Sequence, residues 1–225
     1  MPRMNSSPDT PSSLVPPLRV MGLTLFLLLS ACSPALNWRE VRPAQADALT
    51  GLFPCQPQAV ERVVPWPGVA SGVSMHLLSC QTGDVTWALS YMAMPDVALV
   101  GPALPQLTAQ LRSNLQAASQ MTVNTPGAAR QADQAAMGQD QGPITVPGMT
   151  PAAGAHAWRF LSQRPDGLGA PLNMDIRAWH FSHGLRVFQA SVWRPAEAAK
   201  SQTSEDVANA FLSSFHFPLS TLRCR

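Results

Sequence analysis

The stretch Val73–Tyr91, which reads VSMHLLSCQTGDVTWALSY, decides the fold. Apolar and polar side chains alternate over residues 73–77, and the same alternation recurs over residues 85–91. A period of two is typical of a strand that buries one face strongly. The residues between the two runs, Gln81–Asp84, have the composition of a hairpin turn. The stretch therefore predicts two antiparallel strands, with these apolar residues buried: Val73, Met75, Leu77, Val85, Trp87, Leu89 and Tyr91.

A helix is expected next along the chain. Pro105 suits its first turn. Apolar residues then recur at spacings of three and four, which is the period of a helix with one buried face. These residues are Leu104, Leu107, Leu111, Leu115 and Ala118. We expect this helix to lie with its leucines on the sheet.

The C-terminal part predicts a second long hairpin and a final helix. Residues 156–161, 172–181 and 185–193 carry apolar side chains on both faces over part of their length, which favours strands in the middle of a covered sheet. Thr203 or Ser204 can cap the helix. Its shared apolar face would comprise Val207, Ala210, Phe211, Ser214 and Phe215.

These elements predict an α+β domain over residues 50–219, in which an antiparallel sheet of about six or seven strands is flanked by helices. Residues 122–154 are rich in Gly, Pro, Ala and Gln, and we expect an irregular excursion there with a short strand at Ile144–Val146. The order of the elements, from Leu52-Phe53-Pro54 to the closing Phe211–Phe215, resembles the PsbP-like α-β-α sandwich. The chain is also similar to small lipoproteins of Gram-negative bacteria that have a cysteine after the first proline. The resemblance implies a scaffolding, assembly or ligand-binding role and no shared catalytic residues.

The N-terminal region has the features of an export signal. Arg3 and Arg19 precede the apolar run Val20–Leu29, and no acidic residue lies between Arg19 and Cys32. The run is shorter than the roughly 20 residues that a membrane-spanning helix needs. Leu29-Ser30-Ala31-Cys32 resembles the lipobox of bacterial lipoprotein signal peptides, which implies cleavage before Cys32 and acylation of its thiol.

The lipobox resemblance fixes the remaining boundaries and the expected location. Residues 1–31 would be the signal peptide and residues 32–49 a tether, with a possible strand near Trp38–Val41. The alternative is an ordinary signal peptide cut near Ala31. Ser33 stands where an aspartate would retain a lipoprotein in the inner membrane, so we expect the outer membrane, with the domain facing the periplasm.

Charge argues against a nucleic-acid partner. The full chain carries 15 basic and 13 acidic residues, and residues 32–225 carry 13 and 12. Lys200 is the only lysine, so the sequence has no polybasic patch. The expected partners are instead membrane lipid, through Cys32, and an envelope protein or a small ligand.

The other three cysteines lie in a chain that we expect to be exported to an oxidising compartment. Cys55 and Cys80 lie at the ends of predicted neighbouring strands, so we expect them to form a disulfide. A closed loop of about 25 residues would stabilise the fold by roughly 3–4 kcal/mol. Cys224 remains without an assigned role. No CxxC or Cys–His spacing indicates a metal site.

Few residues suggest chemistry, and no cofactor motif appears. His180 and His183 are three residues apart, which on one strand directs them to opposite faces. Asp175 and Arg177 share a strand face, as in a surface ion pair worth less than ~1 kcal/mol. Ser74 lacks the surroundings of a nucleophile elbow. Trp158, Trp179 and Trp193 suggest packing rather than a ligand site.

Two hypotheses on function remain open. The first is a lipid-anchored, non-catalytic binding or assembly module of the cell envelope. The second is an enzyme with a site built from Asp175, Arg177, His180 or His183 and a loop residue. Convergence of these side chains around a pocket would distinguish the two.

Overall fold

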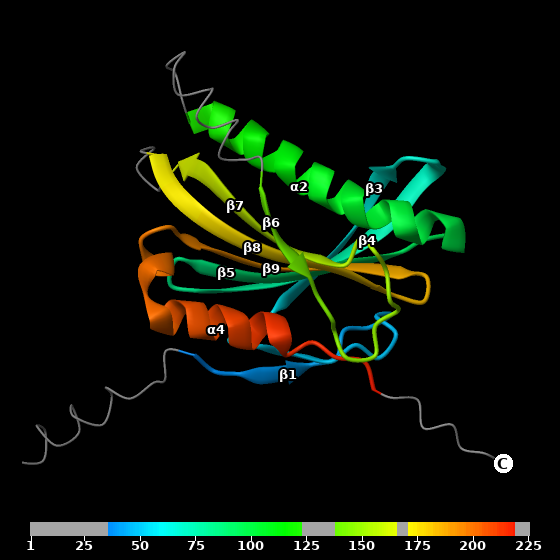
Figure 1. Ribbon diagram of the computed structural model, residues 1–225, viewed down its shortest axis with the longest axis horizontal. Helices are drawn as coiled ribbons and strands as arrows, with labels where there is room; N and C mark the ends of the chain where they lie inside the picture. The colour runs from blue at the N-terminus through cyan, green and yellow to red at the C-terminus, as the bar shows by residue number, and fades with distance from the viewer. Residues whose placement is uncertain (1–35, 123–137, 166–170, 219–225) are drawn as a thin grey trace, which may run out of the picture. The chain divides into compact units, whose positions relative to one another are not determined.

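The computed structural model describes residues 36–122, 138–165 and 171–218. Cys32, Cys224 and the turn expected at residues 165–167 lie wholly or partly outside these ranges. In the described part, a seven-stranded antiparallel sheet is flanked by helices, which confirms the predicted α+β class (Figure 1). The strands are β3 (Gln58–Trp66), β4 (Val69–Thr82), β5 (Val85–Ala93), β6 (Gln139–Pro143), β7 (His156–Pro165), β8 (Pro171–His183) and β9 (Arg186–Pro195).

The strand order across the sheet is β3-β4-β5-β9-β8-β7-β6. The predicted hairpin is present, because β4 and β5 pair antiparallel and Thr82 lies opposite Val85. Gly83 in the turn has a φ of +55°, which a glycine adopts without steric cost. In the long hairpin β8–β9, β9 pairs with β5 and β8 lies on the other side of β9, so both strands are in the interior of the sheet.

Helix α2 (Val100–Thr122) covers one face of the sheet and packs mainly on β7, β8 and β9. Its predicted leucine stripe is buried: Leu104, Leu107, Leu111 and Leu115. The helix begins earlier than expected, so Pro105 lies inside it rather than at its start. A short 3-10 helix, η1 (Val97–Leu99), leads into α2, and Asp96 caps it by accepting a hydrogen bond from the Ala98 backbone N–H.

The opposite face is covered by helix α4 (Gln202–Ser213) and by a two-stranded ribbon, β1 (Arg39–Val41) and β2 (Gly51–Phe53) (Figure 1). Ser201 occupies the N-cap of α4, not Thr203 or Ser204. Ala210 is exposed, while three other helix residues form the buried face: Ala208, Phe211 and Leu212. A short 3-10 helix, η2 (Ala198–Lys200), precedes α4.

Two segments are more ordered than the sequence predicts. In the expected tether, residues 36–49, the strand near Trp38–Val41 is present as β1, and Ala46 and Leu49 are buried in the core. In the expected irregular excursion, the strand lies at Gln139–Pro143 instead of residues 144–146 and forms the edge of the sheet. Among the described residues, no helix combines the length and apolar character that crossing a bilayer requires.

Candidate functional site

Asp175 and Arg177, which the sequence suggests as a surface ion pair, instead belong to a buried network between the sheet and α4. Asp175 is fully buried and pairs with Arg159 on β7 and with Arg194 on β9. Arg177 does not pair with Asp175. It donates hydrogen bonds to Glu205 and Asn209 of α4, at 2.9 and 2.7 Å.

Arg194 is the centre of this network. It is 1% exposed, and its guanidinium bonds to Asp175, to Glu205 and to the carbonyl oxygen of Ser204. A buried charge is tolerated only when it is paired and hydrogen-bonded, and Arg194 meets both conditions. The network therefore fixes α4 on strands β8 and β9. Its carboxylates are held by guanidinium groups and are not directed into a cavity.

The two candidate histidines lie apart, as their spacing predicts. His180 faces α2 and is fully buried, with Nδ1 2.9 Å from the Thr108 hydroxyl. His183 stacks on Phe217 and bonds through Nδ1 to the Gly148 carbonyl oxygen. The four residues of the enzyme hypothesis therefore do not converge on one pocket. Among the described residues, no group of three or more His, Cys, Asp or Glu side chains could hold a metal ion.

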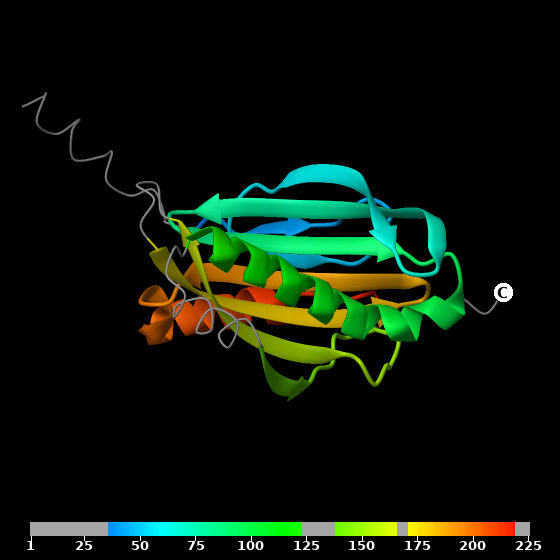
Figure 2. The same ribbon diagram turned by 90° about the horizontal axis from the view of Figure 1, so that it is seen from above.

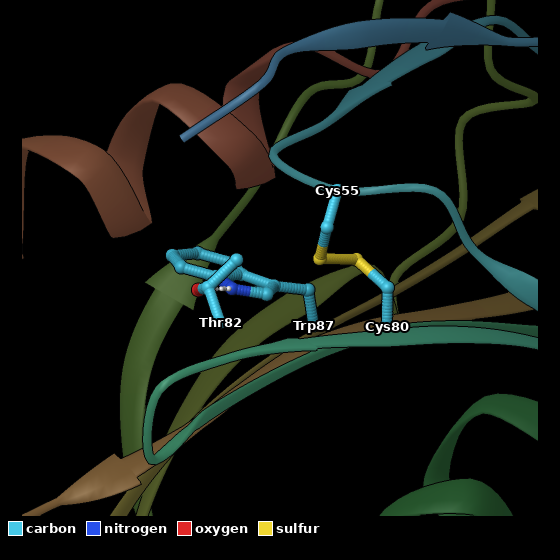
Figure 3. The surroundings of a disulfide bond; sticks show 4 residues. All are labelled: Cys55, Cys80, Thr82 and Trp87. Carbon is cyan, nitrogen blue, oxygen red and sulfur yellow. Dashed lines mark hydrogen bonds between the residues drawn. A yellow bond between two sulfur atoms is a disulfide. The ribbon is translucent and has the colours of Figure 1, made fainter. Parts of the chain in front are cut away.

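The disulfide joins Cys55, just after β2, to Cys80 on β4, with a Cα–Cα distance of 5.9 Å (Figure 3). This is the pair that the sequence predicts. Trp87 lies beside the disulfide and donates a hydrogen bond from its indole Nε1 to the Thr82 hydroxyl at 2.9 Å. The disulfide therefore ties the start of the β2–β3 connection to β4, the second strand of the sheet, on the α4 side.

One hollow, of about 690 Å³, lies between residues 39–44 and strands β3 and β4. Glu61 in this hollow accepts a hydrogen bond from the Ser74 hydroxyl at 2.5 Å and lies 3.7 Å from Nδ1 of His76. The carboxylate thus stands between the serine and the histidine. A histidine base must contact the serine directly to activate it, so this arrangement does not form a nucleophile.

The more enclosed and more apolar cavity, of about 520 Å³, lies between α2 and the sheet, and we call it the α2 cleft. In Figure 2, α2 crosses the sheet obliquely, and most of its contacts are with β7, β8 and β9, so that it leaves part of β3 and β4 without a covering helix. The volume falls in the range of about 300–1,000 Å³ that is usual for small-ligand sites. Its apolar lining includes Trp66, Met75, Leu77, Met92, Leu107, Leu111 and Trp193, and its polar lining includes Arg62, Ser90, Gln110, Asn114 and Gln189.

A buried hydrogen-bond relay leads from α2 to the wall of the α2 cleft. Thr108 bonds to Nδ1 of His180, and Nε2 of His180 lies 3.1 Å from Oε1 of Gln189. Burial lowers the pKa of His180 to about 4, against the weaker opposing effect of its Gln189 hydrogen bond. The imidazole is therefore neutral at pH 7.

Sequence reasoning did not identify Gln189 or Thr108 as site residues. Thr108 carried a detectable signal, because it lies four residues after Leu104 on the apolar side of a predicted helix. A hydroxyl there needs a buried partner. Gln189 carried none, because a polar residue in a strand is ordinarily exposed.

Comparisons with known proteins add little to this picture. No protein-family model and no curated protein matches the chain. Among solved structures, the chain is similar to LpqN of Mycobacterium tuberculosis, which is described as involved in cell envelope biogenesis. The two are 13% identical, with 80% of this chain and 79% of that chain covered and a TM-score of 0.32. We draw neither fold nor function from a similarity this weak, and the PsbP-like and lipoprotein resemblances stay predictions.

Proposed function

We propose that this chain is a lipid-anchored, periplasm-facing binding module of the bacterial cell envelope, without catalytic activity, and that the α2 cleft holds its ligand. The sequence from Arg19 to Cys32 carries the proposal, because it combines a positive charge, an apolar run and small residues before a cysteine. A diacylated cysteine would anchor the protein stably, since each buried methylene contributes about 0.8 kcal/mol. Ser33 favours the outer membrane.

Two structural features support this proposal. The Cys55–Cys80 disulfide is expected in an exported protein, because the periplasm is oxidising. The α2 cleft is a mostly apolar cavity with a few polar groups, which is the usual composition of a small-ligand site. The enzyme hypothesis lacks comparable support, because Asp175 and Arg177 belong to the ion-pair network under α4, while His180 and His183 lie in two other places.

Metabolic labelling with an alkyne fatty-acid analogue tests the anchor. We expect the wild-type protein to incorporate the label and to sediment with the outer membrane. Cys32→Ser should lose both properties. Cys224→Ser is the matched control, because it removes a different thiol and should keep both.

Two results would refute the lipid anchor. One is a wild-type protein that takes up no label, and the other is a Cys32→Ser variant that is labelled and sediments like the wild type. Failure of the anchor would not refute the ligand site, since none of the residues that line the α2 cleft belongs to the proposed signal peptide or tether.

A further inference from the structure

We propose that the α2 cleft selects apolar molecules that carry a hydrogen-bond acceptor, such as a carbonyl or carboxylate oxygen, and that the side-chain amide of Gln189 donates to this acceptor. The inference rests on the proposed ligand site and specifies its chemistry. It follows from how the relay orients one amide group.

The proton positions in the relay are determined by its end groups. The Oε1 atom of Gln189 can only accept, so Nε2 of His180 must carry the proton that joins them at 3.1 Å. A neutral imidazole has one N–H, and Nδ1 is then an acceptor. The Thr108 hydroxyl consequently donates to Nδ1, at 2.9 Å. The other acceptor within reach of this hydroxyl, the Leu104 carbonyl oxygen, is farther away at 3.5 Å, so the hydroxyl proton is assigned to Nδ1 of His180.

This arrangement leaves the amide N–H₂ of Gln189 for the cleft. Its oxygen is held by His180, Gln189 is half-buried, and the residue lines the cavity. No other bond of this side chain is found among the described residues. A donor in apolar surroundings interacts strongly with an acceptor and poorly with a purely apolar group.

The floor of the α2 cleft provides the apolar part of the site. Gln189 lies opposite Ser90 on β5, and Ser90 lies opposite Leu77 on β4. Neighbouring strands are about 4.8 Å apart, so the floor extends sideways from the amide over Leu77 and Met75 towards the edge strand β3. A molecule bound here would place its acceptor at Gln189 and its apolar body on these side chains.

Arg62 adds a preference for negative charge. It lines the cleft from β3, opposite Met75, and makes no ion pair among the described residues. An anionic acceptor would therefore gain attraction from Arg62 that a neutral acceptor lacks. Because Arg62 is exposed, we expect this contribution to be small and sensitive to salt.

Thr108 and His180 act as positioning residues in this scheme. They are buried, at 6% and 0% exposure, and neither of them lines the α2 cleft. Their effect on the ligand is transmitted through the orientation of the Gln189 amide. Loss of the Thr108 hydroxyl should therefore weaken the preference for an acceptor, beyond any general loss of stability.

A matched set of probes separates acceptor recognition from apolar binding. The set comprises 2-acetylnaphthalene, 2-isopropenylnaphthalene, which has nearly the same shape without the oxygen, and 2-naphthoate, which is anionic. Binding is measured by equilibrium dialysis of the full-chain protein in lipid nanodiscs, with empty nanodiscs subtracted. We expect 2-acetylnaphthalene to bind roughly threefold to tenfold more tightly than 2-isopropenylnaphthalene. We also expect Arg62→Ala to weaken 2-naphthoate selectively.

Variants of Gln189 test the donor itself. Gln189→Glu keeps an oxygen for His180 and removes the donor, so it should abolish the preference for 2-acetylnaphthalene. Gln189→Leu should do the same. Gln58→Leu, the same change at an exposed residue of β3 that does not line the α2 cleft, is the matched control and should keep the preference.

Variants of Thr108 test the positioning role. Thr108→Val should reduce the preference, and Thr108→Ser should restore it. The readout is the ratio of the two dissociation constants, which a merely structural change would leave unaltered.

Three results would overturn the inference, and they differ in what they imply for the proposed ligand site. The first is that the two neutral probes bind equally well and that Leu77→Trp, which fills the cleft, abolishes the binding of both. The α2 cleft would then be a ligand site without selectivity for an acceptor. An acceptor preference that survives Gln189→Glu would place recognition elsewhere in the cleft. No binding above empty nanodiscs would refute the α2 cleft as a ligand site as well.

Discussion

The burial and the ion-pair partners of Asp175 and Arg194 depend on a part of the chain that is distant in sequence. Asp175 and Arg177 do share a strand face, as their spacing predicts. Their burial follows from α4, which covers that face and brings Glu205 to Arg194 and Arg177. The residues of the strand do not indicate this burial, because the covering helix begins at Gln202, well beyond the end of the strand.

His180 gives a prediction at the same scale. Its pKa is about 4 in the folded protein, below the ordinary 6.5, because burial disfavours the charged imidazole. The unfolded chain therefore binds a proton that the folded protein excludes as the pH falls below 6.5. The stability that follows from this is fully present above pH 6.5 and is lost as the pH falls towards 4.

We expect the free energy of unfolding to fall by about 2 kcal/mol more in the wild type than in His180→Gln between pH 7.5 and pH 5. Urea titrations at the two pH values provide the measurement. His216→Gln, which removes an exposed histidine, is the control for the loss of an imidazole. Equal pH dependence in His180→Gln and the wild type would contradict the burial of a neutral imidazole.

The sequence predicts those helices and strands whose formation depends on local residue patterns. The hairpin of β4 and β5 and the leucine face of α2 follow from periodicity and turn residues. The edge strand β6 does not, because Gln139–Pro143 contains no apolar residue and pairs through its backbone with β7. The α2 cleft could not be predicted from the sequence either, since it depends on the angle at which α2 crosses the sheet.

The disulfide is the element-scale feature with the clearest effect on stability. It closes a loop with a sequence separation of 25 and restrains the ribbon of β1 and β2 against the sheet. In the chain-entropy account, such a loop stabilises the folded state by roughly 3–4 kcal/mol. We expect Cys55→Ala/Cys80→Ala to lose about this much in urea titrations.

Reduction provides the control for the disulfide prediction. Dithiothreitol should lower the stability of the wild type to that of Cys55→Ala/Cys80→Ala and leave this double variant unchanged. A wild-type protein whose unfolding is insensitive to the reductant, with both thiols free to alkylation, would show that the bond is absent.

At the scale of the whole molecule, the two faces of the seven-stranded sheet differ in what they contribute. The α4 face holds the charged network and the disulfide, which serve stability, and the more open hollow beside residues 39–44. The α2 face leaves a cavity beside a partly covered sheet. Even-numbered residues of β8, such as His180, face α2, while Asp175 and Arg177 face α4. Because alternate residues of a strand face opposite sides, changes on the α4 face should affect stability without affecting the ligand site.

Asp175→Asn tests this division. It leaves Arg194 buried with one carboxylate partner fewer, so we expect a loss of about 3 kcal/mol in the free energy of unfolding. The dissociation constant of 2-acetylnaphthalene should stay within a factor of about two of the wild-type value, because the network does not line the α2 cleft. At a hundred times this constant, the probe should restore about 2.7 kcal/mol, since it binds only the folded state.

Arg177→Gln is the milder companion variant, because Arg177 is less buried than Arg194, and it remains informative if Asp175→Asn fails to fold. It should lose about 1–2 kcal/mol and bind the probe as the wild type does. Gln189→Glu should behave in the opposite way, with an altered probe preference. A tenfold weaker affinity in Arg177→Gln would mean that the faces are coupled. The coupling would then run through β8 and β9, the two strands that carry both the network and the relay.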